Sequence, residues 1–147
     1  KQFRLLTEET ARKWRFPIGD VNTVTEQFES GQIVYFGSEG KVKAVPIASL
    51  HDSSESIIGV AMDTYIPTVN ECAGAGLATV IVGEHFGQTK AYDTANTYTK
   101  GTRLYSSTSE TGNFAASATT GPAIGYVVEE RGDWLEYVWT GRQPQVA

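Results

Sequence analysis

The sequence predicts an all-β protein, a small barrel or sandwich built from two related halves. Short runs of β-branched and aromatic residues suit strands, and 15 glycines punctuate these runs. The turns recur about every 8–12 residues without a long amphipathic helix, which is typical of barrels and sandwiches. One pattern of strands and glycines also occurs twice along the chain.

In each copy of this pattern, a glycine precedes a short strand ending in tyrosine, and a turn glycine follows. An Ile-Gly strand and a strand running into glycine complete the copy. The matched segments are Gly31–Tyr35 with Gly101–Tyr105, Gly40–Val42 with Gly112–Phe114, Ile57–Ala61 with Ala123–Val127, and Ala78–Gly83 with Glu136–Gly141. The offset falls from 70 residues (Gly31 to Gly101) to 58 (Gly83 to Gly141). The loops therefore differ in length between the two copies, while the strands recur. Such repetition predicts a body built from two related halves.

A chain of 147 residues fits one domain. We expect an N-terminal arm over residues 1–30 and a β body over residues 31–147, with halves at about 31–83 and 101–141. Thr7–Trp14 could form one or two helical turns with Thr7 as the N-cap, although the capping box is incomplete. The arm is therefore predicted to be extended or partly helical.

Four strands are expected in the first half. They are Gln32–Phe36, Lys41–Val45, Ile57–Met62 and Leu77–Val82. The second strand alternates valines with lysines and ends at Pro46. The third is mostly apolar, which is consistent with burial on both faces.

Residues 83–87 are expected to turn the chain, and the polar insert Lys90–Tyr98 to join the halves. The second half then reads as Thr102–Tyr105, a strand or loop over Phe114–Thr120, Ala123–Glu129 and Trp134–Thr140. The last strand is apolar on both faces apart from Glu136, which favours a central or interfacial position. The repeated Ile-Gly pairs at Gly59 and Gly125 indicate sharp bends at the corners of a barrel.

Composition narrows the classes of function. The chain carries 12 basic and 17 acidic residues, a net charge of −5, and the acidic residues are scattered. Phosphate binding needs a basic footprint, so nucleic acid is not expected as the partner. No apolar run approaches the roughly 20 residues that span a bilayer, so no membrane association is expected. The single cysteine, Cys72, excludes an internal disulfide and reads as a small buried residue.

No catalytic, metal or cofactor motif stands out. His51 and His85 lie far apart in sequence and are expected on the surface or in loops. A triad using Cys72 and His85 is conceivable, but no nucleophile elbow occurs. The tripeptide Arg131–Asp133 matches the one used by some integrin ligands, yet a turn between two strands explains it. We therefore expect no enzyme and no cofactor.

The doubled pattern resembles the small phage head decoration, or cement, proteins with a duplicated β-barrel or β-tulip body. The resemblance covers about residues 31–141. It implies a non-enzymatic virion protein, assembled in the host cytoplasm, on the outer surface of an icosahedral capsid. Such proteins sit as homotrimers between capsomers of the major capsid protein and stabilise the shell.

The resemblance also implies that the N-terminal arm contributes to capsid attachment. The candidate interface residues are apolar anchors interspersed with basic side chains: Phe3, Leu5, Arg12, Lys13, Trp14, Arg15 and Phe16. The same aromatic residues could instead cap the protein's own barrel. Two further functions remain open: a phage fibre, tail or baseplate module, and a carbohydrate-binding module that uses exposed residues such as Trp134 or Trp139.

Overall fold

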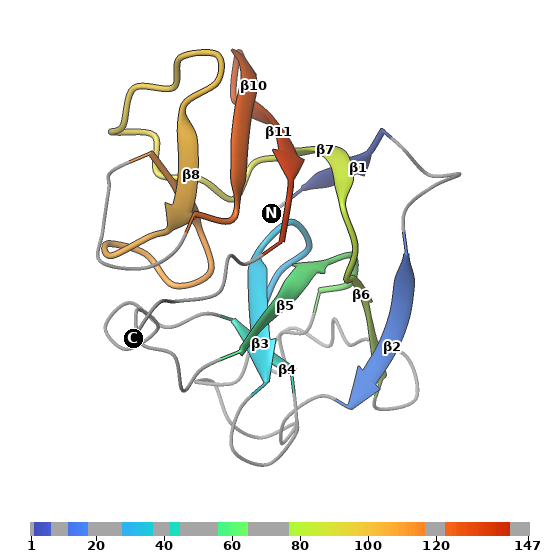
Figure 1. Cartoon of the computed structure of the whole chain (residues 1–147). Helices are drawn as coiled ribbons and strands as arrows, with labels where there is room; N and C mark the ends of the chain where they lie inside the picture. Colours follow the sequence, from blue (N-terminus) through green and yellow to red (C-terminus); the bar gives the residue numbers. More distant parts are fainter. Residues whose placement is uncertain are drawn as a thin grey trace, which may run out of the picture.

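The computed structural model describes residues 2–6, 12–17, 28–36, 42–44, 56–64, 77–116 and 123–141. None of these residues is helical, and eleven strands form two antiparallel sheets (Figure 1). The prediction of an all-β protein is confirmed.

The six-stranded sheet has the order β1-β7-β11-β10-β8-β9. Its strands are β1 (Phe3–Leu5), β7 (His85–Thr89), β8 (Arg103–Ser106), β9 (Phe114–Ala115), β10 (Gly125–Arg131) and β11 (Trp134–Trp139). As expected from its apolar faces, β11 is central and lies between β7 and β10. The turn expected over residues 83–87 was wrong, because β7 begins at His85. The sequence did not indicate this strand, since its buried positions are a histidine, a glycine and a threonine rather than aliphatic residues.

The five-stranded sheet has the order β2-β6-β5-β3-β4. Its strands are β2 (Lys13–Pro17), β3 (Ile33–Phe36), β4 (Val42–Ala44), β5 (Ser56–Ala61) and β6 (Leu77–Ile81). The last four correspond closely to the strands expected in the first half. β2 occupies part of the segment considered for helical turns, of which residues 7–11 lie outside the described residues.

The same strand order occurs in both sheets. The order β6-β5-β3-β4 in one matches β11-β10-β8-β9 in the other. The backbone contacts also match: the Gly31 amide donates to the Ala61 carbonyl and the Gly101 amide to the Val127 carbonyl, each at 2.8 Å. Gly31 and Gly101 have positive φ values of 89° and 82°. A left-handed backbone at both positions explains why each of these strands is preceded by glycine.

The last strands of the two halves match in a slightly different register from the one expected. Ala61 and Val127 occupy equivalent positions, and they pair with Val80 and Tyr137, respectively. Val80 and Tyr137 are 57 residues apart in the sequence. Matching Gly83 with Gly141 gives 58 instead. The glycines that follow these strands are therefore not structurally equivalent.

The described strands do not form a closed barrel. Closure requires hydrogen bonding between the first and last strands of a sheet. The described pairings join neither β1 to β9 nor β2 to β4, so both sheets stay open. The expectation of a barrel was wrong for the described strands. β4 has three residues and β9 two, which leaves little backbone on which a closing strand could pair.

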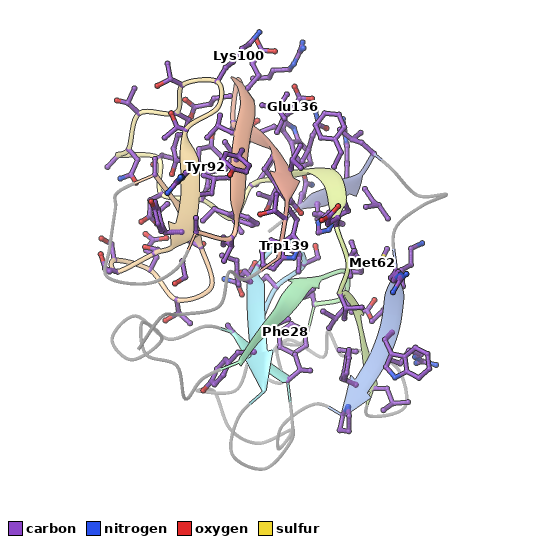
Figure 2. All side chains as sticks on the ribbon, in the orientation of Figure 1. Phe28, Met62, Tyr92, Lys100, Glu136 and Trp139 are labelled. Carbon is purple, nitrogen blue, oxygen red and sulfur yellow. The ribbon has the colours of Figure 1, made fainter. Side chains whose placement is uncertain are left out.

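The two sheets share a hydrophobic core. Ile33 and Val60 of the five-stranded sheet pack in one cluster with Phe114, Tyr137 and Trp139 of the six-stranded sheet. Figure 2 shows Trp139 at the junction of the two sheets. The insert between the halves contributes two buried tyrosines, Tyr92 and Tyr98, to this cluster. A second, smaller cluster lies within the five-stranded sheet around Phe28 and Val80.

The N-terminal segment belongs to both sheets. β1 pairs antiparallel with β7, and β2 pairs antiparallel with β6. Hydrogen bonds extend this pairing beyond the strands, from the Leu6 amide to the Phe86 carbonyl (2.8 Å) and from the Val82 amide to the Arg12 carbonyl (2.9 Å). The described part of the arm is therefore extended, and it pairs along consecutive strands of the body.

Gly59 and Gly125 occupy equivalent positions where two strands approach closely. A Cβ atom on Gly59 would lie 1.9 Å from the carbonyl oxygen of Ile81, and one on Gly125 would lie 2.2 Å from that of Val138. Neither glycine has a positive φ. Close backbone approach, rather than a left-handed conformation, therefore requires the repeated glycine.

Replacing Gly59 or Gly125 with alanine should lower the free energy of unfolding by about 1–3 kcal/mol or more, because a backbone carbonyl must move. Gly83→Ala is the matched control: the atoms nearest its Cβ would be side-chain atoms of Arg12, at 3.3–3.4 Å, and not a backbone carbonyl. That control should change stability by less than about 0.5 kcal/mol. Urea unfolding of the three variants measures this difference, and equal losses in all three would refute the role of close approach.

Candidate interaction surface

Of the three candidate catalytic residues, His85 alone lies among the described residues. Cys72 and His51 lie outside the described residues. His85 begins β7 and is only 4% exposed, so the expectation of a surface or loop histidine was wrong. Its burial follows from the inward-facing alternation of β7, whose outward neighbours are only partly buried.

His85 is held as a neutral structural residue. The carbonyl of Gly83 can only accept, so Nδ1 donates to it (2.9 Å), and Nε2 accepts from the Tyr137 hydroxyl (2.7 Å). The ring also stacks on Trp139, with centroids 6.0 Å apart. Burial lowers the pKa of His85, and the hydrogen bond to Gly83 partly opposes that effect. Both ring nitrogens of His85 are therefore engaged in hydrogen bonds within the protein.

Metal binding finds no support among the described side chains. No group of three or more His, Cys, Asp and Glu residues there could hold an ion. Asp93 and Glu110 both lie beside Asn113, whose amide nitrogen donates to both carboxylates, at 3.1 and 2.8 Å. The amide donor of Asn113 thus binds both carboxylates, while its Oδ1 atom is buried without a hydrogen-bond partner.

The Arg131–Asp133 tripeptide is explained by the hairpin between β10 and β11. Gly132 has a φ of 61°, as a tight turn requires. Arg131 forms ion pairs with Glu129 and Glu136, and Asp133 pairs with Lys90 at 2.8 Å. The hydrogen bond from Lys90 lowers the pKa of Asp133. Both charged side chains thus already have ion-pair partners.

The tryptophans considered for carbohydrate stacking are not open platforms. Trp139 is 1% exposed and belongs to the core. Trp134 is partly buried, and its ring is contacted by the cationic groups of Arg4 and Lys90, 4.6 and 5.0 Å from the ring centroid. A sugar would have to displace these cation–π contacts.

The largest exposed aromatic side chain lies on β2. Trp14 is 66% exposed, more than any other large hydrophobic residue that the structure describes. Side chains alternate along a strand, so Trp14 shares its face of β2 with Phe16. Phe16 packs against the smaller core cluster, whereas Trp14 lies beyond it. Apolar surface thus continues from the core to the edge of the sheet.

A mainly apolar groove borders this strand. It has a volume of about 720 Å³, and its described lining consists of Arg12, Lys13, Trp14, Phe16 and Val82. Val82 joins the groove because its amide bonds to the Arg12 carbonyl across the two strands. Sequence reasoning missed Val82, since only the pairing of β2 with β6 brings it there.

Two of the residues that line the groove, Arg12 and Lys13, are basic. Arg12, Lys13 and Arg15 are all exposed, within a chain whose net charge is −5. We define the β2 surface as Arg12, Lys13, Trp14, Arg15, Phe16 and Val82. It combines an apolar anchor with a local positive charge, which suits an acidic partner.

The structure places the seven predicted interface residues in two groups. Five of them, from Arg12 to Phe16, lie together on the β2 surface. Phe3 and Leu5 lie on β1 in the other sheet. Phe3 packs against the shared core and meets the His85 ring edge-on at 6.4 Å, so it caps the protein's own core.

Comparisons with known proteins do not assign this chain to a family. No family model, no curated protein and no solved structure matches this chain. The described residues also include no helix long and apolar enough to cross a membrane.

Because burial lowers the pKa of His85, acid should destabilise the protein through this residue. The unfolded state takes up a proton below pH about 6.5, while the folded state resists it. Stability should be highest above that pH and fall on acidification, by at most about 1.4 kcal/mol per pH unit, until the folded pKa is reached. Urea unfolding of the wild type and His85→Gln between pH 5 and 8 measures the difference. An equally steep decline in both proteins would contradict the assignment.

Proposed function

We propose that this protein is a non-enzymatic virion structural protein that binds the outer surface of a phage capsid and stabilises the shell. Its partner is the major capsid protein, and it bridges neighbouring capsomers. The observation that carries the proposal is the β2 surface, where an exposed tryptophan lies beside an apolar groove among basic residues. The resemblance of the doubled strand pattern to phage decoration proteins supplies the class of partner.

The β2 surface has the composition of a binding hot spot. Tryptophan and arginine are enriched among the residues that dominate interface energies. Trp14 exposes two thirds of its surface, so docking can bury a large apolar area there. The exposed Arg12 guanidinium at the groove would pair with an acidic capsid residue and orient the two proteins.

The anchors are also held in place before binding. β2 pairs with β6 over five registered positions, from Lys13 with Ile81 to Pro17 with Leu77. A surface on a paired strand loses less conformational freedom on docking than a flexible tail does. Pre-organisation therefore favours a rigid attachment point over a loose arm.

Shell stabilisation follows from repetition on a symmetric lattice. Each bound copy favours the intact shell by mass action, because it binds the assembled lattice and not the separated subunits. In the proposed assembly, homotrimers with tulip-like bodies of two related halves occupy sites between capsomers. Trimers would engage the lattice through three β2 surfaces at once, which strengthens a modest individual affinity.

A phage fibre, tail or baseplate module is the second candidate. The β2 surface suits any acidic virion partner, so the observation that supports decoration supports this function as well. The carbohydrate-binding alternative is less favoured, because Trp139 is buried and Trp134 is contacted by Arg4 and Lys90.

The decisive experiment uses empty shells assembled from the major capsid protein encoded by the same genome. Purified protein is added to the shells, bound copies are counted after sedimentation, and the shells are heated in a calorimeter. Saturable binding with a raised shell melting temperature is the expected result. Saturable binding to isolated tail or fibre proteins, with none to shells, would instead establish the second candidate.

Trp14→Ala should weaken shell binding by about 2 kcal/mol, or about thirtyfold in Kd, because the main anchor is lost. The free energy of unfolding of the Trp14→Ala variant should change little, since the Trp14 side chain is mostly exposed. Tyr126→Ala is the matched control, an exposed aromatic residue (41%) on β10 of the other sheet, and should bind normally. Sedimentation titration of both variants measures the effect. Equal affinities for the two variants would remove the β2 surface from the proposal.

A further inference from the structure

A small polar pocket lies beside β1, the edge strand of the six-stranded sheet. It has a volume of about 340 Å³, and its described lining consists of Gln2, Phe3, Arg4, Ser30 and Trp134. These residues come from three distant parts of the sequence: β1 and the residue before it, the segment that precedes β3, and the start of β11. A pocket of this volume is at the lower end of those that hold small molecules, so its ligand would be about the size of one sugar.

Arg4 supplies the positive charge of this pocket. Its guanidinium carbon lies 4.6 Å from the centroid of the Trp134 ring, and the Lys90 ammonium group lies 5.0 Å from the same centroid. Lys90 is paired with Asp133 at 2.8 Å, whereas the Arg4 guanidinium forms no ion pair or hydrogen bond with any described residue. The cation–π contact therefore holds the guanidinium in place, while its N–H donors lack an acceptor among the described residues.

The carboxylates on the neighbouring strands already have partners. Gln88 lies between Arg4 and Glu136 in the register of the sheet. Glu136 accepts hydrogen bonds from Gln88 and Arg131, and Glu129 forms an ion pair with Arg131. A carboxylate partner for Arg4 would therefore come from a bound molecule.

We propose that this pocket binds a small hydroxylated carboxylate, with the chemistry of a sugar acid, and that Arg4 binds its carboxylate group. The site lies apart from the β2 surface, and the inference does not rest on the proposed function. Arginine binds a carboxylate through two parallel N–H···O hydrogen bonds. The single unpaired positive charge of Arg4 also complements one carboxylate better than a doubly charged phosphate ester.

The remaining lining suits the rest of such a molecule. The side-chain amide of Gln2 can both donate to and accept from hydroxyl groups. The Gln2 main chain is held in place, because its carbonyl accepts a hydrogen bond from the Lys90 amide at 2.9 Å. Phe3 and Trp134 add aromatic surface against which the C–H groups of a sugar ring can pack.

The cations at Trp134 distinguish an acidic sugar from a neutral one. A neutral sugar that stacked on the Trp134 ring would displace the contacts from Arg4 and Lys90. A carboxylate would instead bind the Arg4 guanidinium where the ring holds it. The arrangement that disfavours stacking of a neutral carbohydrate therefore favours an acidic one.

The first test adds three sugar acids, glucuronate, galacturonate and N-acetylneuraminate, to the isotope-labelled protein in NMR titrations. We expect saturable shifts of the Arg4 side-chain and Trp134 indole N–H signals, with a Kd of about 1 mM for at least one acid. Glucose lacks the carboxylate and acetate lacks the ring, so each should bind about tenfold more weakly or worse. No saturable shift with any of the three acids would overturn the proposal, as would equally tight binding of glucose or acetate.

Substitutions at Arg4 test its role, with Arg103→Gln as the matched control. Arg103 is also an exposed arginine of the six-stranded sheet, on β8, which is separated from β1 by three strands. Arg4→Gln should weaken binding about tenfold or more, and Arg4→Lys about fivefold, because lysine keeps the charge but lacks the planar fork. Arg103→Gln should leave the affinity unchanged. Equal losses in Arg4→Gln and Arg103→Gln would assign binding to overall charge and contradict the site.

Two readouts separate loss of the site from other effects of these substitutions. The Lys90 amide donates to the Gln2 carbonyl, so its protection from hydrogen exchange confirms that β1 remains paired in each variant. Trp14→Ala should bind sugar acids as the wild type does, because Trp14 belongs to the other sheet. A loss of binding in Trp14→Ala equal to that in Arg4→Gln would place the ligand elsewhere and overturn the proposal.

Two further probes identify the source of the carboxylate. A linked tetramer of mannuronate that binds as tightly as the single acids would indicate a residue of an acidic polysaccharide, and binding of the single acids alone would indicate a free sugar acid. Capped tetraglutamate carries the same acidic group on a peptide. Tighter binding of tetraglutamate than of every sugar acid would make the ligand a protein segment and overturn the proposal.

Discussion

The shared hydrophobic core is the interaction on which the rest of this structure depends. Each sheet is open and has short edge strands, so neither could bury enough apolar surface alone. Packing Ile33 and Val60 against Tyr137 and Trp139 removes one face of each sheet from water. It also fixes where β6 passes into β7, and thereby where the N-terminal strands can pair. The β2 surface exists because this junction positions β6 so that β2 can pair with it at the edge of the sheet.

Much of the fold could be predicted from glycine and strand spacing. The strands beginning after Gly31 and Gly101 lie where the repeat indicates, because a left-handed residue must precede each of them. Closure into a barrel could not be predicted, since it depends on pairing between strand edges that side-chain patterns do not encode. β7 was missed because burial of His85 and Gly87 depends on Tyr137 and Phe3 from distant strands.

The candidate site was predictable in composition but not in arrangement. The basic and aromatic character of residues 12–16 is plain in the sequence, whereas the adjoining Val82 is joined to them only by pairing across the sheet. The separation of Phe3 from Trp14 likewise follows from the order of strands in the two sheets and not from the local sequence. These two apolar residues, eleven positions apart in the N-terminal arm, have different roles because β1 and β2 belong to different sheets. One packs inward on the core and the other faces solvent.

The pairing of β1 and β2 has a consequence for how the protein is made. Their partner residues lie far along the chain, 60 residues apart for Pro17 with Leu77 and 86 for Phe3 with Thr89. During translation, these strands leave the ribosome well before their partners do. Such distant pairing is slow to form, and unpaired apolar strands are prone to associate with other chains. The segment that carries Trp14 is therefore exposed to association with other chains until the strands that pair with it have been synthesised.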